Sequence, residues 1–579
     1  TEYNQSETFM FTTGLPESFD MAILADSTYY NQDGEYDLDR LARWHNENDT
    51  IETIVLDISD LSSNPKTWVT GPYGDANPAN PFKRDDEDVV TNLAMFNDTQ
   101  AQIRNYIRYL NYEHDVTYVL LAGNNDTIPM RYLFANSSGA PALGSEYHDL
   151  VPTDMYYGCL NGSFNEDEDT NQAPTEPDQD YGPYGGWGEN LSENGNIDEA
   201  WWNYSVSIGR FLCKDTTGLS NMVQKTITYL NTPETDSYLQ NVTLAGMGGG
   251  WEGNYWLAEY AKTLNGTYTW WDGEETIGFN PNEWNLNVLD SNPNRDEGKP
   301  FTDANSHDLF NQGTHVWYQA SHGMVDGWHF SDGEGNDFLN EDILSLTNKD
   351  KPTLVLSCLP CLTADIEDTR DAFAVNFMED DDGAFAGVFN TKYGWGSYND
   401  ASHGYDGLNA SSHYIGSQIV DSWMTGTANR LGDMVYEAKK YAPNWQEPKP
   451  DLSIRWATYE QILFGDPAIQ LKTYNPGNTP PQITNIDATP NPQNTGGNVN
   501  ISCMVADNQA VNQVSVNITG PAGFESINMS MNQINTNTYY YEQSYSILGE
   551  YTYSIWSTDD QGLVSHSIEK SFTIIEPAT

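Results

Sequence analysis

Short apolar runs recur along most of the chain, and stretches with helical spacing separate them. Seven runs have the length and the β-branched and aromatic content of buried strands. They lie at residues 19–24, 54–58, 118–122, 242–245, 314–319, 353–357 and 384–389. The helical stretches lie at residues 37–44, 88–110, 221–230 and 255–264. Strands that alternate with helices predict an α/β fold, with a mostly parallel sheet between two helical layers.

The C-terminal part of the chain follows a different pattern. Residues 474–482 are rich in Pro, Gly, Asn and Thr and predict a linker. After it, alternating runs at 499–505, 511–518 and 549–556 are separated by turn residues, at intervals typical of a β-sandwich. Only Cys503 lies here, so an inter-sheet disulfide is excluded. We therefore expect residues 483–579 to form an immunoglobulin-like β-sandwich.

The composition indicates a folded protein with a strongly acidic surface. Lys and Arg number 25 and Asp and Glu number 84, which gives a net charge of −59. Such a charge repels nucleic acid and anionic membranes, and no apolar run approaches the roughly 18 residues that a membrane-spanning helix needs. The 17 Trp, 36 Tyr and 20 Phe residues exclude a disordered acidic chain. The charge is therefore expected on the outside of a core, as in proteins that stay soluble in salt.

Cysteine and asparagine usage points to an extracellular location. The five cysteines are too few for a disulfide scaffold, and their odd number leaves at least one thiol free in a monomer. The first residues lack the basic and apolar pattern of a signal peptide, so we expect any such segment to be gone already. Candidate N-glycosylation sequons, which predict a secreted glycoprotein, begin at Asn4, Asn48, Asn97, Asn125, Asn136, Asn161, Asn190, Asn203, Asn241, Asn265, Asn409, Asn500, Asn517 and Asn528.

Two predicted strands end in reactive residues. Ser321, His322 and Gly323 follow the run at 314–319, and Cys358 follows the run at 353–357. Neighbouring parallel strands would place His322 and Cys358 together at the carboxyl edge of the sheet, where α/β proteins form their sites. A thiol beside an imidazole becomes a nucleophilic thiolate, and Gly323 leaves backbone amides accessible as oxyanion donors.

Other interpretations of these residues remain open at this point. A cysteine at a strand end is also a common core residue, and a His-Gly pair is also a common turn. Cys358 and Cys361, with His322 or His329, could supply zinc ligands, although a second Cys-x-x-Cys pair is missing. A non-enzymatic surface protein that binds a partner is the main alternative function. The abundance of Trp and Tyr also suggests a carbohydrate-active protein, but no carboxylate pair stands out.

At these residues the sequence resembles the caspase-fold cysteine peptidases. Two motifs narrow the resemblance to the gingipain-like peptidases, which form peptidase family C25. They are Ile208-Gly209-Arg210-Phe211 and Phe464-Gly465-Asp466-Pro467. A catalytic domain followed by an immunoglobulin-like domain also resembles that family. The resemblance implies a secreted cysteine endopeptidase with a caspase-like α/β/α catalytic unit. We expect an N-terminal subdomain at residues 1–210 and a catalytic subdomain at 211–473.

The resemblance also implies roles for individual residues. Cys358 is the expected nucleophile, His322 the general base and acid, and the amides of Gly323 and Cys358 the oxyanion hole. The acid that orients the histidine falls near residues 123–126, where Asn124 is the expected residue and Asp126 the alternative. The sequence departs from the family in one respect. The family often has a glycine two or three residues after the nucleophile, whereas Cys358 is followed by Leu359, Pro360 and Cys361.

Two further residues are expected to bind the substrate side chain at P1, the residue before the cleaved bond. Asp154 lies in a segment that resembles the base of the S1 pocket in arginine-specific members. Trp395 matches an aromatic wall of that pocket. A carboxylate pairs well with a cation, and a flat ring supports an apolar stem. The resemblance therefore predicts cleavage after Arg or Lys.

Acidic loops predict structural calcium, the one cofactor that we expect. Carboxylate and amide oxygens spaced along a glycine-rich loop are ligands for hard cations, and gingipain-like enzymes use such ions. A complete EF-hand loop is not present in the sequence, and a solvated acidic surface is the alternative interpretation. The candidate ligands are Asp332, Glu334, Asn336, Asp167, Asp169 and Asp198.

Overall fold

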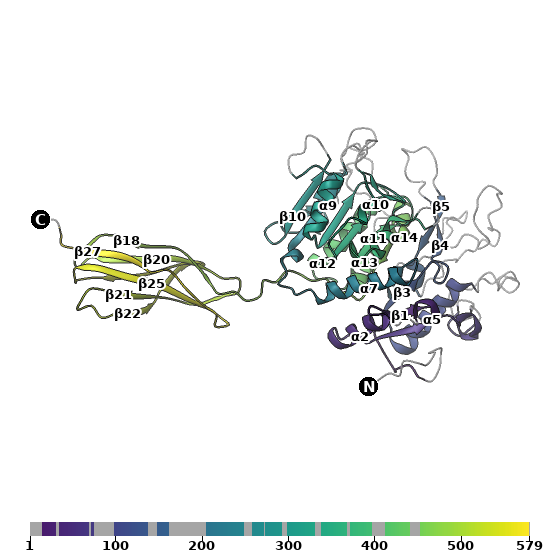
Figure 1. Cartoon of the computed structure of the whole chain (residues 1–579), viewed down its shortest axis with the longest axis horizontal. Helices are drawn as coiled ribbons and strands as arrows, with labels where there is room; N and C mark the ends of the chain where they lie inside the picture. The colour runs from purple at the N-terminus through teal and green to yellow at the C-terminus, as the bar shows by residue number, and fades with distance from the viewer. Residues whose placement is uncertain are drawn as a thin grey trace. The chain divides into compact units, whose positions relative to one another are not determined.

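The chain forms two compact units. The computed structural model describes residues 14–30, 34–68, 71–74, 98–136, 148–160, 204–247, 257–270, 273–291, 298–329, 337–366, 371–395, 411–440 and 452–577. One unit comprises residues 1–233 and 237–473, and the other comprises residues 234–236 and 474–579 (Figure 1). The expected internal boundary at residue 210 falls within strand β6 (Ser207–Leu212), so the sheet continues across it.

A ten-stranded sheet forms the centre of the first unit. Its neighbouring strands are parallel, except that β16 and β17 run antiparallel. The strands, in their order across the sheet, are β10 (Asn285–Asp290), β7 (Asn241–Gly246), β11 (Val316–Ala320), β15 (Thr353–Ser357), β16 (Ala384–Asn390), β17 (Gln461–Phe464), β6 (Ser207–Leu212), β3 (Tyr118–Gly123), β1 (Met21–Ala25) and β2 (Thr53–Asp57).

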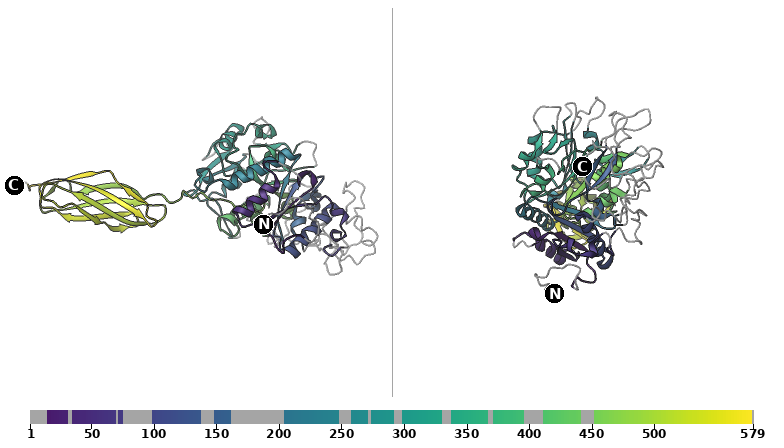
Figure 2. Two further views of the ribbon diagram at one scale, coloured as in Figure 1. Left: turned by 60° about the horizontal axis from the view of Figure 1, so that its bottom comes forward. Right: turned by 90° about the vertical axis from the view of Figure 1, so that its right-hand side faces the viewer.

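Helices cover both faces of this sheet, as Figures 1 and 2 show. Adjacent residues of β11 point to opposite faces, as strand geometry requires. Trp317 stacks on Phe310 of α9, with ring centroids 4.2 Å apart. The Tyr318 hydroxyl bonds to His413 of α12 at 2.6 Å. The main helices are α2 (Leu38–Asn48), α5 (Thr99–His114), α7 (Thr216–Asn231), α9 (Asp303–Gln312), α11 (Phe373–Glu379), α12 (Ser411–Met424), α13 (Leu431–Lys440) and α14 (Leu452–Glu460).

The predicted fold class is confirmed: a mostly parallel sheet with helices, followed by all-β sheets. All seven predicted strands are present, as β1, β2, β3, β7, β11, β15 and β16. Strands β6, β10 and β17 were not predicted, because β10 is mostly half-exposed and β17 is short. The helix expected at 88–110 begins at Thr99 as α5 within the described residues, where Asp98 caps it by accepting from the amide of Ala101 at 2.8 Å.

The second unit consists of two sheets around a separate core, and their strands pair antiparallel except for β19 with β27, which are parallel. Tyr551 and Phe572 stack in this core with ring centroids 5.1 Å apart, and Cys503 is buried as a free thiol. One sheet contains β18 (Gln482–Thr489), β20 (Asn498–Ala506), β24 (Thr538–Ser544) and β23 (Asn532–Asn535). The other contains β19 (Gln493–Asn494), β27 (Lys570–Ile575), β25 (Gly549–Asp559), β21 (Val511–Thr519) and β22 (Ile527–Ser530), and β26 (Val564–His566) also pairs with β25.

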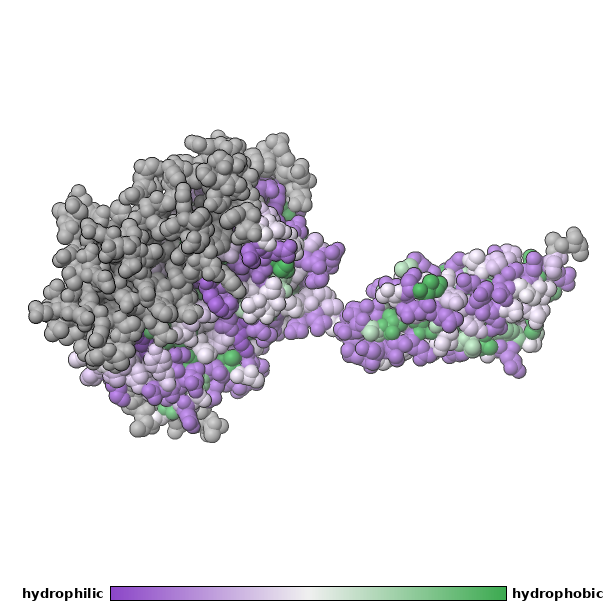
Figure 3. Space-filling view, turned by 180° about the vertical axis from the view of Figure 1, so that it is seen from behind, coloured by the Kyte–Doolittle hydropathy of each residue, from purple (hydrophilic) through white to green (hydrophobic). Residues whose placement is uncertain are grey.

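On the face that Figure 3 shows, the described surface is mainly hydrophilic, which agrees with the excess of acidic residues. Large exposed apolar side chains occur mostly singly, as is normal for folded proteins. None of the helices in the described part of the chain is both long enough and apolar enough to cross a bilayer.

A buried histidine joins helix α2 to the end of strand β17. The His45 ring contacts Asp466 through Nε2 at 2.7 Å and Asp49 through Nδ1 at 3.0 Å. Arg430 completes the cluster with a bidentate pair to Asp49. Burial opposes the charged ring, but the two carboxylates outweigh it and raise the pKa of His45 to about 9. The Phe464-Gly465-Asp466-Pro467 motif therefore has a structural role in this fold.

This cluster predicts that the first unit loses stability in mild alkali. The folded-state pKa of about 9 lies above the ordinary 6.5, so the stabilisation is complete below about pH 6.5 and disappears as the pH rises through 9. The full effect on the free energy of unfolding is roughly 3 kcal/mol. Urea unfolding at a series of pH values measures it. His45→Gln should flatten the dependence, whereas a matched change at the exposed His566 should preserve it; equal curves for wild type and His45→Gln would contradict the assignment.

Candidate functional site

The two predicted reactive segments leave the sheet side by side. Strands β11 and β15 are parallel neighbours, with Val316 opposite Leu354 and Tyr318 opposite Leu356. This register confirms the adjacency expected from the sequence. Past β11 the chain enters a small hairpin, in which β12 (His322–Met324) pairs with β13 (Gly327–His329). The histidine segment and the cysteine segment therefore meet at the carboxyl edge.

Gly323 lies directly against the loop that follows β15. A Cβ atom at this position would lie 2.5 Å from the carbonyl oxygen of Cys361, 2.9 Å from its nitrogen and 2.7 Å from Cβ of Pro360. Backbone atoms cannot yield to such a contact, so only glycine fits here. The His322–Gly323 peptide is thus held against Cys361, three residues beyond the predicted nucleophile.

The Cys358 thiol points into the core, which contradicts its expected role. Cys358 continues the alternation of Leu354 and Leu356, so its side chain faces helix α12. Its Sγ lies 3.0 Å from where a Cβ of Gly416 would be, and the residue is 0% exposed. Burial raises the pKa of this thiol far above its usual range. A peptide carbonyl cannot reach it, and Cys358 is a core residue.

Cys361 is the cysteine at the surface of the site. It alone among the five is partly exposed, and its Sγ contacts the carbonyl oxygen of Gly394 at 3.7 Å. The next residue, Leu362, has a φ of +60°, which is rare for a branched side chain and typical of functional loops. Burial, with a contribution from Glu460, raises the pKa of the Cys361 thiol to about 12, so the resting thiol is protonated.

Polar side chains from two neighbouring strands hold this cysteine loop. Asn390, the last residue of β16, donates from Nδ2 to the carbonyls of Cys358 at 2.8 Å and Pro360 at 3.1 Å. Gln461, the first residue of β17, donates from Nε2 to the carbonyl of Cys358 at 3.1 Å. The amide of Leu362 donates to the carbonyl of Lys392 at 2.7 Å. These bonds fix the loop before substrate binds.

A second histidine lies opposite the first on the hairpin. His322 and His329 are directly paired across β12 and β13. Nδ1 of the His329 ring contacts the Asp337 carboxylate at 2.7 Å. In the described part of the chain, the groups of three metal-binding side chains do not include these histidines or the cysteines. The arrangement therefore does not support the zinc alternative.

Asn124 lies too far from His322 to orient it, which corrects the sequence-based expectation. Its strand, β3, is separated from β11 by five strand spacings, or about 24 Å. The Asn124 side chain instead accepts from the amides of Asp126 and Thr127, each at 3.0 Å. Asp126 belongs to the same turn, so the alternative is excluded for the same reason.

Asp154 is already paired inside the protein. Its two carboxylate oxygens accept from Nε and Nη2 of Arg210 at 2.7 and 2.6 Å, and both side chains are buried. The remaining Arg210 nitrogen, Nη1, donates to the carbonyl of Ile128 at 2.6 Å. A substrate cation would have to displace a bidentate guanidinium. Asp154 therefore has a structural role in place of the expected one in the S1 pocket.

Trp395 lies beside the cysteine loop, where a pocket wall was expected. It follows Gly394, whose carbonyl contacts the Cys361 thiol. The ring is 8% exposed and packs edge-on against Trp456, with centroids 5.5 Å apart. Its amide donates to the Ser412 hydroxyl at 2.8 Å. This position is compatible with contact to a substrate side chain.

The predicted calcium ligands lie outside the described residues, as Asp332, Glu334, Asn336, Asp167, Asp169 and Asp198 all do. Within the described residues, Asp380, Asp381 and Asp382 bring three carboxylates within 4.8 Å of one another. Lysine side chains of the protein already contact this turn. Lys225 donates to the carbonyl of Asp382 at 2.7 Å, and Lys349 pairs with Asp381 at 2.9 Å.

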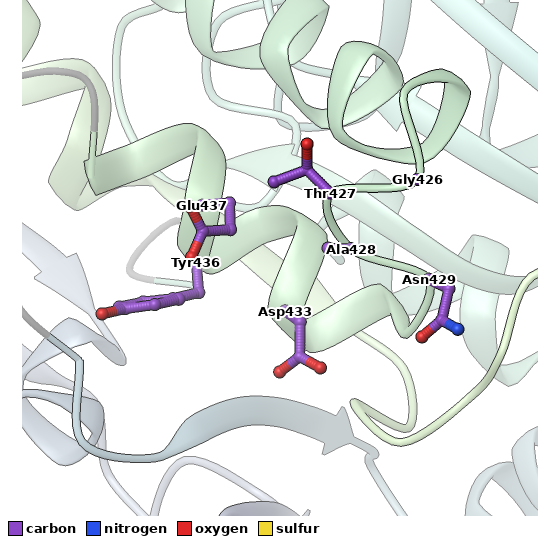
Figure 4. Close-up of a pocket in the computed structure, with 7 residues that line it drawn as sticks. All are labelled: Gly426, Thr427, Ala428, Asn429, Asp433, Tyr436 and Glu437. Carbon is purple, nitrogen blue, oxygen red and sulfur yellow. The ribbon is translucent and has the colours of Figure 1, made fainter.

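A pocket of about 430 Å³ lies against helix α13 and the loop that precedes it, away from these residues (Figure 4). Asp433 points into it, and its carboxylate accepts from Tyr118 at 2.6 Å and from Ser207 at 2.8 Å. Tyr118 and Ser207 begin β3 and β6, in the other half of the sheet. The residues that line the pocket include neither histidine nor cysteine, so it is separate from the proposed Cys-His site.

Comparison with known protein families identifies a single family for most of the chain. The profile of peptidase family C25 matches residues 15–472. The chain therefore belongs to peptidase family C25, and it is a cysteine-type peptidase whose substrates are proteins or peptides. No protein with curated annotation matches it.

Two solved structures resemble the whole chain weakly. One is described as "Structure of Protease"; it shares 14% identity, covers 96% of this chain and 97% of its own, and has a TM-score of 0.48. The other is dimeric latent PorU from Porphyromonas gingivalis, with 11% identity, coverage of 97% of this chain and 44% of its own, and a TM-score of 0.31.

The Asp154–Arg210 pair predicts a stability defect in Asp154→Asn. The change leaves a buried guanidinium without a counter-charge, which should lower the free energy of unfolding by about 3–5 kcal/mol. Urea unfolding measures this loss. Asp126→Asn, at an exposed position, is the matched control and should change stability by no more than about 0.5 kcal/mol. If the Asp154→Asn protein had normal stability and an altered P1 preference, this result would contradict the structural role and support a place for Asp154 in the S1 pocket.

Proposed function

We propose that the protein is a cysteine endopeptidase in which Cys361 is the nucleophile and His322 the general base and acid. The contact of Gly323 with the backbone of Cys361 carries this proposal, because it brings the only partly exposed thiol beside the histidine segment. The proposal moves the nucleophile from Cys358 to Cys361.

The reaction follows from these positions. His322 takes the proton of the Cys361 thiol, and the thiolate adds to the peptide carbonyl to form a tetrahedral oxyanion. His322 then gives the proton to the leaving amine as the C–N bond breaks, which leaves a thioester. Water, deprotonated by the same imidazole, hydrolyses the thioester and restores the thiol. The raised pKa of Cys361 means that the thiolate forms only when His322 accepts its proton.

The oxyanion hole uses two backbone amides. These are the amides of Gly323 and Cys361, which meet where the histidine segment touches the cysteine loop. Both amides belong to segments that the protein holds rigid, so they stabilise the developing charge without reorganisation. This pair replaces the pair of Gly323 and Cys358 expected from the sequence.

We also propose a preference for Arg or Lys at P1 and an extracellular location. The net charge of −59 concentrates cationic peptides near the protein, and the ring of Trp395 can support the apolar stem of a long side chain. The N-glycosylation sequons and the acidic surface support the proposed extracellular location. The alternative, a non-enzymatic surface protein on the same scaffold, predicts no hydrolysis at all.

The assignment of the nucleophile predicts opposite results for the two cysteines. Cys361→Ala should lower peptide hydrolysis below detection, since no other partly exposed thiol exists among the described cysteines. Cys358→Ala should retain most activity, because it removes only a core thiol. Hydrolysis of a fluorogenic peptide measures both. An alkylating reagent followed by mass spectrometry should modify Cys361 and spare Cys358; the reverse pattern would return the role to Cys358.

We further propose structural calcium in the acidic loops around Asp332 and Asp167. Clustered carboxylates repel one another without a cation, so bound calcium should stabilise the native state. Thermal melting with calcium and with a chelator should differ by several degrees. An Asp332→Asn, Glu334→Gln variant should respond less to calcium, and identical melting curves for wild type in both conditions would rule the proposal out.

A further inference from the structure

The side chain of Asn390 holds the peptide unit that joins Pro360 to Cys361. Asn390 is the last residue of β16 and is fully buried. Its Nδ2 donates to the carbonyl oxygens of Cys358 at 2.8 Å and of Pro360 at 3.1 Å. The Pro360 carbonyl and the N–H of Cys361 belong to one planar peptide unit. Asn390 therefore contacts one end of the peptide whose other end is a proposed oxyanion donor.

The two ends of this peptide unit face different neighbours. In a trans peptide the C=O and N–H bonds point in opposite directions, so a bond to the Pro360 carbonyl turns the N–H of Cys361 away from Asn390. The histidine segment lies beside the nitrogen end, since a Cβ atom added to Gly323 would be 2.9 Å from the Cys361 nitrogen. The bond from Asn390 thus holds the peptide from behind while its nitrogen stays beside Gly323.

Only the donor half of the Asn390 carboxamide is used. Within the described part of the chain, Oδ1 of this side chain is buried and has no hydrogen-bond partner. Gln461 also donates to the Cys358 carbonyl, whereas the bond to Pro360 comes from Asn390. A Cβ atom added to Gly394 would lie 2.8 Å from Nδ2 of Asn390, so the donor is closely enclosed. The position keeps a buried donor at the cost of an unpaired acceptor, which favours a role for that donor.

We propose that Asn390 is a positioning residue that aligns the backbone amide of Cys361 for the tetrahedral oxyanion. This inference rests on the proposed function and adds a residue that acts through the backbone without touching the substrate. Complete burial suits this role, because the side chain acts from behind the loop. An amide stabilises an oxyanion best when it is oriented in advance. A hydrogen bond to the carbonyl also polarises the peptide, which makes its N–H a better donor.

The kinetics of Asn390→Leu test the inference, because leucine has the same branched shape but no donor. The kcat for a fluorogenic peptide should fall by about 10- to 100-fold, since a misaligned amide loses part of what a whole oxyanion donor supplies. KM should stay close to the wild-type value, because the oxyanion forms only after the substrate has bound. Alkylation of Cys361 by iodoacetamide should also keep its wild-type rate, because displacement of iodide by the thiolate creates no oxyanion.

Gln461→Leu is the matched comparison, since Gln461 pairs directly with Asn390 across the two strands. The change removes two bonds to carbonyls, those of Cys358 and Ser412, but leaves the bond from Asn390 to Pro360. Urea unfolding should show similar losses of stability for the two leucine variants. The fall in kcat should be clearly larger for Asn390→Leu.

A second variant, Asn390→Ala, has no bulk that could displace the loop and should show the same loss of kcat even if Asn390→Leu folds poorly. A wild-type kcat in either folded variant of Asn390 would overturn the positioning role. Equal losses of hydrolysis and of alkylation would overturn it as well, because they would indicate a general collapse of the cysteine loop. These results leave the proposed peptidase function intact, whereas a wild-type protein that hydrolyses no peptide would contradict that function itself.

Discussion

The close approach of the Gly323 backbone to Cys361 is the constraint on which the site depends. The parallel register of β11 and β15 brings the two segments to one edge, but it does not by itself choose a cysteine. The missing side chain at Gly323 allows the histidine segment to touch the loop at Pro360 and Cys361. Asn390 and Gln461 then fix that loop from the neighbouring strands. The proposed nucleophile, base and oxyanion donors thus depend on one backbone contact between two strand ends.

The interior of this acidic protein is organised by paired charges. Two buried cations lie against carboxylates: Arg210 pairs with Asp154, and His45 contacts Asp466 and Asp49. Others, such as Arg104 and Lys225, donate to backbone carbonyls. Such pairs are not a large source of stability, since desolvation offsets most of the attraction, but breaking one is costly. They therefore fix the relative positions of elements far apart in the sequence. Glu460 differs, because burial dominates its surroundings and keeps its pKa raised.

Much of the fold could be predicted from the sequence, because hydrophobic periodicity reports burial. The runs that became β7, β11, β15 and β16 are apolar enough to mark buried strands. Strand β17 was missed because its four residues directly follow helix α14, without a turn signal. At the site, the alternation of β15 extends one step beyond the strand. Leu354, Leu356 and Cys358 share a face, so the same pattern marks Cys358 as a core residue and leaves Cys361 beyond the strand.

Residues that act through long-range pairing left no local signal. Nothing near Asp154 in the sequence shows that Arg210 occupies its carboxylate, because 56 residues separate them. Glu460 is likewise one of 84 acidic residues until β17 returns beside β16. That single antiparallel strand has two consequences. At its start it places Glu460 and Gln461 at the cysteine loop, and just beyond its end it places Asp466 against His45. The same short segment therefore links the edge of the sheet that carries the cysteine loop to the charge cluster that holds helix α2.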